Sequence, residues 1–159
     1  MLTFVLHRAR EQQKAVHAIE DDYGNVFYDF QVKKDGTVDN RIVSWLPSWL
    51  SKGLVKHVFH SVVAVDLDSE QVTDATLAEV VKLRHVKALY ISNASITNDD
   101  LGVLKSLPEL RVVILNTEGI TDEATEHLAG CPLLRELTID NSGITDSGLL
   151  QLRRARQLK

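Results

Sequence analysis

The sequence lacks the residues that would build a disulfide framework, a thiolate metal site or a membrane span. Cys131 is the only cysteine among 159 residues, which excludes an intramolecular disulfide and a zinc site made of several thiolates. No apolar run approaches the roughly 20 residues that cross a bilayer. The apolar stretch at residues 2–6 is also too short for the core of a signal peptide. We therefore expect a soluble domain of unknown compartment.

Positive charge is scarce in the second half of the chain. Residues 61–152 carry 6 Lys+Arg against 15 Asp+Glu, whereas residues 1–60 are nearly balanced. Non-specific nucleic-acid binding needs lysine and arginine along one face, so we expect no nucleic-acid partner. The sequence also has no nucleophile motif, phosphate loop or dinucleotide fingerprint. These absences predict a protein that is not an enzyme and that needs no cofactor or metal.

A repeat of 24 residues dominates the chain from residue 62 onward. Its turn triplet is Val-Thr-Asp at 72–74, Ile-Thr-Asn at 96–98 and Ile-Thr-Asp at 120–122 and 144–146. Three of the apolar columns with this period are Val65, Leu89, Val113 and Leu137; Leu67, Ile91, Leu115 and Ile139; and Val80, Leu104, Leu128 and Leu152. We predict four repeats over residues 62–159, with a fifth cut short, and an N-terminal cap over residues 1–61.

Each repeat changes its period from two to three. Val113 and Leu115 alternate as in a strand with one buried face, whereas Leu101, Leu104 and Leu107 are three apart, as in a short helix. The Thr-Asp pair between them suits a helix N-cap. We therefore predict four parallel strands, each followed by a short helix. Their expected centres are Asp66, Tyr90, Ile114 and Thr138.

These columns resemble the leucine-rich repeat, in the subtype with a Leu-x-x-Leu-x-Leu start and an Ile-Thr-Asp turn. The resemblance implies an α/β solenoid with a parallel sheet on its concave face and short helices on its convex face. One feature departs from the family pattern. The usual Asn or Cys after the strand is replaced by Glu70, Ala94, Glu118 and Ser142. A continuous asparagine ladder is thus absent, and the two glutamates must turn outward or find partners.

The first sixty residues predict a cap of helix, strand and helix. An amphipathic helix should end near Gly24, and alternation over residues 26–32 indicates a strand. Asp35-Gly36 is a turn, and Pro47 should begin a second helix with Trp49, Leu50, Leu54 and Val58 on one side. This order resembles repeat proteins abundant in planctomycete-type bacteria, a family without one assigned activity. Members often carry a membrane span before the helix, so residues 2–6 could be the stub of an anchor.

The strand positions that alternate with the buried leucines should point onto the concave face. There we expect an apolar centre of Tyr90, Val112 and Ile114, flanked by polar and acidic groups. The full set of candidate ligand-binding residues is Asp66, Asp68, Tyr90, Ser92, Val112, Ile114, Asn116, Glu136, Thr138 and Asp140. We also expect Lys87, Arg111 and Arg135 to form a basic stripe along one sheet edge. The preferred hypothesis is a non-enzymatic module that binds another protein of unknown identity.

Two other functions stay open. The chain could be an assembly or scaffold subunit that makes contacts through the ends of the solenoid. The last repeat leaves Leu149 and other apolar residues uncovered, so the chain could also self-associate there, unless the arginine-rich segment at residues 153–157 covers them. A hydrolase that uses Asp66 and Asp68 is the less favoured alternative, because such a pair is usually a solvated surface.

Other reactive side chains also have plain explanations. His57 and His60, three residues apart, could offer two metal ligands, but spacing fixes no third, and a pair facing water is the simpler interpretation. Cys131 falls in an apolar column and should be a small buried hydrophobic residue.

Overall fold

A five-stranded sheet runs through the whole molecule, with strands in the order β1-β2-β3-β4-β5. The computed structural model describes residues 2–33, 54–153, 155, 157 and 158. The strands are β1 (Asn25–Tyr28), β2 (Val62–Asp68), β3 (Ala88–Ser92), β4 (Val112–Asn116) and β5 (Glu136–Asp140). The helices are α1 (Leu2–Asp21), α3 (Leu54–Phe59), α4 (Asp74–Val80), η2 (Asp99–Ser106), α5 (Asp122–Ala129) and α6 (Asp146–Leu152). The turn predicted at Asp35-Gly36 and the helix start at Pro47, with Trp49 and Leu50, lie outside the described residues.

The strands β2 to β5 are parallel, and their pairing follows the 24-residue period without a slip. Val65 pairs with Leu89, Leu89 with Val113, and Val113 with Leu137. The four strands predicted around Asp66, Tyr90, Ile114 and Thr138 are therefore confirmed, as is the α/β class. Because side chains alternate between the two faces of a strand, this register stacks each apolar column on one side of the sheet.

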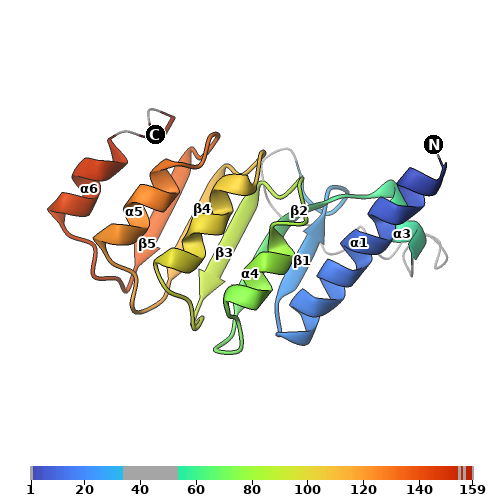
Figure 1. Cartoon of the computed structure of the whole chain (residues 1–159), viewed down its shortest axis with the longest axis horizontal. Helices are drawn as coiled ribbons and strands as arrows, with labels where there is room; N and C mark the ends of the chain where they lie inside the picture. The colour runs from blue at the N-terminus through green and yellow to red at the C-terminus, as the bar shows by residue number, and fades with distance from the viewer. Residues whose placement is uncertain (1, 34–53, 154, 156, 159) are drawn as a thin grey trace.

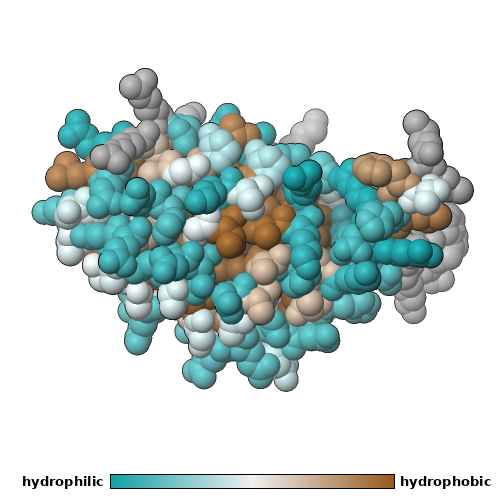
Figure 2. All heavy atoms as spheres, viewed as in Figure 1, coloured by the Kyte–Doolittle hydropathy of each residue, from teal (hydrophilic) through white to brown (hydrophobic). Residues whose placement is uncertain are grey.

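The helices α1, α4, η2, α5 and α6 lie side by side on one face of the sheet (Figure 1). Each apolar column is buried between the sheet and these helices, as the fully buried Leu67, Leu89, Leu104 and Leu128 illustrate. The outer surface of the helical layer is mostly hydrophilic, with an apolar area near its middle (Figure 2). The other face of the sheet is called the open face below, because no helix of the described residues covers it.

The second repeat forms a 3₁₀-helix, η2, where the other three form α-helices. Leu101 and Leu104 are fully buried, and Leu107 follows directly after the helix and is also buried. A 3₁₀-helix has three residues per turn, so a spacing of three places Leu101 and Leu104 on one line, while Leu107 follows in extended backbone. The predicted short helix is confirmed, and its leucine spacing fits the tighter form.

The helix α1 ends near Gly24, as the sequence predicts, with Asp21 as its last residue. Tyr23, with φ 64°, takes the left-handed position, and the N–H of Gly24 donates to the carbonyl of Ile19 at 2.8 Å. Gly24 is required for a different reason. A Cβ on it would lie 2.7 Å from Cγ2 of Ile19 and 2.8 Å from Cδ2 of Leu67. The glycine thus allows the cap to pack tightly against β2.

The strand β1 is shorter than expected and joins the repeat sheet. It ends at Tyr28 rather than near residue 32, because Gln31 closes a turn back onto Tyr28 through both its N–H and its side-chain oxygen. The strand pairs antiparallel with β2, with Val26 opposite Val65. The cap and the first repeat therefore share one continuous sheet.

The turn triplets carry a polar ladder from one repeat to the next. Oδ1 of Asn98 accepts the N–H of Thr121 at 2.9 Å, and its Nδ2 donates to the Thr121 hydroxyl at 2.8 Å. Asp122 repeats the arrangement, because its two oxygens accept the N–H and the hydroxyl of Thr145, both at 2.7 Å. These side chains link neighbouring turns in addition to any capping role. The predicted absence of an asparagine ladder directly after the strands stands, and Glu70 and Glu118 both turn outward.

The last repeat is the least covered part of the described core. Leu137, Ile139, Ile144 and Leu152 are only partly buried, and Leu149 is 57% exposed. The chain after α6 covers some of this end, since Ala155 is buried and the Gln157 amide donates to the carbonyl of Cys131 at 2.8 Å. Of the arginines expected to cover it, Arg154 and Arg156 lie outside the described residues.

Among the helices of the described residues, none has the length and apolar character needed to cross a membrane.

We predict that Gly24→Ala lowers the free energy of unfolding by about 1–3 kcal/mol, because the added methyl group clashes with Ile19 and Leu67. Urea denaturation measures the change. Gly143→Ala is the matched control, since its Cβ would meet neighbours at an ordinary 3.5 Å. Equal effects of the two substitutions would contradict the packing argument.

A second prediction concerns the ladder at Asp122. Its hydrogen bonds from Thr145 lower the carboxyl pKa below the ordinary value of 3.8. A lowered folded-state pKa adds stability above the unfolded-state pKa, and this stability is lost as the pH falls through the folded-state pKa. Asp122→Asn, which copies Asn98, should keep the ladder and remove this part of the acid dependence below about pH 4. Asp122→Ala should destabilise the chain at neutral pH as well. Acid-unfolding curves that are the same for all three proteins would argue against the ladder.

Candidate functional site

The open face collects the sequence-predicted residues into rows that cross the strands. The register places Asp66, Tyr90, Ile114 and Thr138 side by side in one row, and Asp68, Ser92, Asn116 and Asp140 in the next. Ala88, Val112 and Glu136 form a third. Neighbouring strands lie about 4.8 Å apart, so residues in one row contact each other through their side chains. All ten candidate ligand-binding residues therefore belong to one continuous surface.

An apolar centre lies in the middle of this surface. Tyr90, Val112 and Ile114 are each partly exposed, whereas the alternating Leu89, Val113 and Leu115 are fully buried. Tyr90 stands between Asp66 and Ile114 in its row. The tyrosine ring combines a large apolar area with a hydroxyl, a combination enriched at protein interfaces. The centre can bury an apolar group of a ligand without any change in the core.

Acidic groups flank this centre on both sides. Asp66 is partly exposed, and its pKa is raised, first by burial and then by the neighbouring charge of Asp68. Asp68 itself is held by Asn93, whose Nδ2 donates to its Oδ1 at 2.7 Å. Glu136 and Asp140 are exposed on the far side, on β5. The surface therefore suits a ligand that brings apolar groups to the centre and positive charge to the sides.

The strand β1 adds two residues that the sequence patterns did not identify. Asn25 pairs with Asp66 and Phe27 with Ala64, so both lie on the open face. Phe27 is partly exposed and extends the apolar part of the surface toward the cap. Its alternation with Val26 and Tyr28 marks it as facing away from the core. Nothing local, however, could tell which strand β1 would join.

Lys87, Arg111 and Arg135 form the expected basic stripe. Their backbones continue the sheet ladder by one residue, because the N–H of Arg111 donates to the Lys87 carbonyl and that of Arg135 to the Arg111 carbonyl, both at 2.8 Å. All three are exposed, at the amino ends of the parallel strands. The turns at the other ends of the strands are acidic, and residues 68–79, 92–104, 116–127 and 140–152 contain no lysine or arginine. The amino ends and the carboxyl ends of the parallel strands thus carry opposite charge.

The remaining reactive side chains have structural partners. His57 and His60 do not face water as a free pair: His57 contacts Gln12 and Tyr28, and Nδ1 of His60 lies 3.0 Å from Asp29. Burial lowers the pKa of His57 to about 4. Cys131 is fully buried, as expected, and burial raises its pKa to about 11. In the described parts of residues 2–33 and 54–158, no three side chains of His, Cys, Asp or Glu are grouped so that they could hold a metal ion.

No family model matches the chain, and no curated protein matches it either.

The shared electrostatics of Asp66 and Asp68 lead to a third prediction. Asp68→Asn removes the neighbouring negative charge, so the pKa of Asp66 should fall toward its ordinary value while burial keeps it somewhat raised. Carboxyl NMR titration of Asp66 measures the shift. Asp140→Asn is the control, since it removes an exposed carboxylate on β5, three strands away, and should leave Asp66 unchanged. A pKa of Asp66 that does not respond to Asp68→Asn would refute the coupling.

Proposed function

We propose that this chain is a non-enzymatic protein-binding module, built as a leucine-rich-repeat solenoid whose open face is the concave binding surface. The 24-residue period, the parallel register of β2 to β5 and the helices on one face support the solenoid. The observation that carries the binding role is the partly exposed apolar centre of Tyr90, Val112 and Ile114. An apolar centre with a polar rim is the usual anatomy of a protein interface.

The proposed partner is a protein that presents an apolar anchor beside basic side chains. The anchor would pack on Tyr90 and Ile114, and basic groups would meet Asp66 and Asp68 on one side and Asp140 on the other. Charges at the rim mainly steer association and select partners, whereas the buried centre supplies most of the affinity. This role needs no cofactor, metal or catalytic group. A hydrolytic role for Asp66 and Asp68 stays a hypothesis with less support, because Asn93 already occupies an oxygen of Asp68.

The fourth prediction tests the open face directly. Changing Tyr90 and Ile114 together to aspartate should weaken partner binding by at least about 100-fold, because charged groups at the centre cannot be buried without a large desolvation cost. Both side chains are only partly buried, so we expect the melting temperature and circular-dichroism spectrum to change little. The measurement is quantitative affinity capture from the source cell, followed by titration with the captured protein.

Val103→Asp provides the matched control. Val103 lies on η2 in the helical layer and is 38% exposed, so the substitution adds one aspartate, against two in the double variant, to an apolar surface position away from the open face. Only proteins that the wild type and the control retain, and the Tyr90 and Ile114 variant loses, count as partners of the open face. Capture that survives in the double variant would overturn the proposal.

Surviving capture would instead favour the second candidate, an assembly or scaffold subunit that uses the ends of the molecule. The exposure of Leu149 and Leu150 on α6, 57% and 61%, favours contacts at that end. Exposed apolar patches of this kind often mark sites of association.

A further inference from the structure

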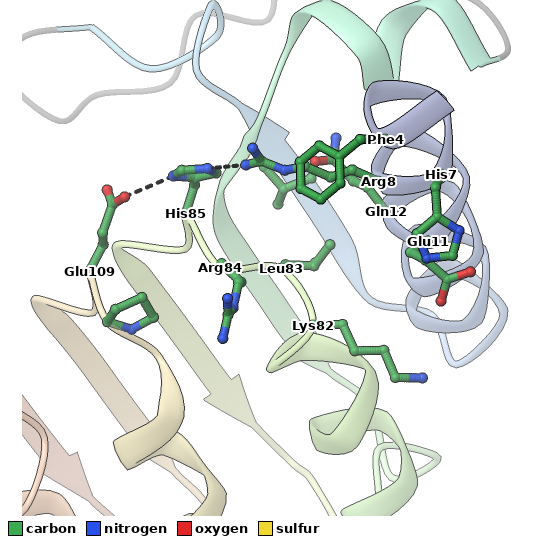
Figure 3. A pocket seen from close by; sticks show the side chains of 12 residues that line it. Phe4, His7, Arg8, Glu11, Gln12, Lys82, Leu83, Arg84, His85 and Glu109 are labelled. Carbon is green, nitrogen blue, oxygen red and sulfur yellow. Dashed lines mark hydrogen bonds and ion pairs between the residues drawn. The ribbon is translucent and has the colours of Figure 1, made fainter. Parts of the chain in front are cut away.

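A groove lies between the amino-terminal half of α1 and the loop that follows α4. Its volume is about 720 Å³, within the range of ligand-binding sites. Four separate segments line it: α1, the start of β2, the loop after α4, and the residues just before β4 (Figure 3). Val62 and Leu83 line it and are buried, whereas Phe4 lines it with 72% of its side chain exposed. This α1–α4 groove thus combines an apolar base with an exposed aromatic ring.

The charge in the groove is opposite to that of the repeats. Arg8, Lys82 and Arg84 line it, together with two histidines and two glutamates. Both glutamates already have cationic or histidine partners: Glu11 lies 2.9 Å from Lys14, and Glu109 lies 2.8 Å from His85 and 3.8 Å from Lys87. Lys82 is itself paired with Glu79 at 2.5 Å, whereas the side chain of Arg84 has no hydrogen bond or ion pair to any residue that the structure describes. The groove is therefore a local positive site on a chain with a net charge of −4.

A chain of hydrogen bonds fixes the central cation. Nδ1 of His85 faces the Glu109 carboxylate at 2.8 Å, and Nε2 of His85 faces a terminal nitrogen of Arg8. A guanidinium can only donate, so Nε2 must accept from Arg8 and Nδ1 must carry the hydrogen that is donated to Glu109. This interaction uses one of the five N–H groups of Arg8, and the other four have no partner among the described residues. Arg8 is thus held in place with donors to spare for a carboxylate.

The placement of the cations favours an extended ligand with several carboxylates over a single small anion. Figure 3 shows the side chains of Arg8, Arg84 and Lys82 pointing in different directions rather than toward one point. A single phosphate or carboxylate could not contact all three. An extended chain with several carboxylates and an apolar side chain could do so, with its apolar group against Phe4 and Leu83.

We propose that the α1–α4 groove binds an acidic peptide segment of another protein, with one carboxylate on Arg8, a second near the side chain of Arg84, and an apolar side chain against Phe4. This site is separate from the open face and has the opposite charge preference. It does not depend on the proposed function of that face.

The fifth prediction uses the purified chain and a fluorescent copolymer of glutamate and tyrosine as the probe. Fluorescence anisotropy should show binding that weakens as salt is added. Arg84→Glu, a surface change that leaves the Arg8–His85–Glu109 chain intact, should weaken binding about tenfold or more, and Arg8→Ala about as much. Phe4→Ser should weaken binding of the copolymer more than binding of polyglutamate, which has no aromatic group.

Arg135→Glu is the matched control, because it reverses an exposed cation on the sheet edge outside the groove. It should leave the affinity nearly unchanged. The proposal is overturned if the copolymer does not bind, if a neutral copolymer of glutamine and tyrosine binds equally well, or if Arg135→Glu has the same effect as Arg84→Glu. Displacement of the probe by millimolar inorganic phosphate at constant ionic strength would show a simple anion site instead. Self-association of the chain that Arg84→Glu abolishes would identify a second copy as the occupant.

Discussion

The in-register pairing of β2 to β5 is the constraint on which the rest of the structure depends. A shift by one residue would turn every leucine of a strand from the core to the open face, so the buried columns fix the register strongly. Once fixed, the same register aligns the turns and the open-face residues of neighbouring repeats. It brings Asn98 to Thr121 and Asp122 to Thr145 in the turns, and it places Tyr90 beside Ile114 on the open face. Core, polar ladder and candidate binding surface thus share one cause.

The repeat made the strands and helices of residues 62–152 predictable, because the four repeats agree at nearly every apolar position of the core, with Thr125 as a polar exception. Features that depend on a single contact were less accessible. The helix α1 ends at Asp21, and the turn after it brings Gly24 against Leu67 of a strand more than forty residues later, a contact that no local pattern contains. Similarly, the alternation around Tyr28 indicated a strand but not its partner, so Phe27 was missed as part of the open face. Local propensity fixes an element, whereas tertiary packing fixes its ends and its neighbours.

The prediction that the turn triplets cap the helices holds for Thr145 at α6, but no side-chain cap hydrogen bond is present at Asn98 before η2 or at Thr121 before α5. The Thr-Asp pair was expected to cap helices, and the Thr145 hydroxyl does accept the N–H of Ser147. Yet the more extensive contacts of Asp122 reach across to the next repeat. This cross-repeat contact was not identified in the sequence, although the recurrence of a polar side chain after threonine is its visible trace. Its physical effect is to satisfy a backbone N–H that lies before a helix, where no helical carbonyl is available.

The charge distribution connects the two proposed sites to the architecture. Every helix of the repeats begins at the acidic edge of the sheet, and acidic residues there complement the positive end of each helix dipole. The basic residues then collect at the opposite edge, where Arg84 and His85 also border the α1–α4 groove. The charge pattern that stabilises each repeat therefore also produces two surfaces that suit ligands of opposite charge. If both proposals hold, a partner that satisfies the open face with basic groups cannot use the same segment to fill the groove. The molecule would then hold two different segments at once, either from one partner of mixed charge or from two partners.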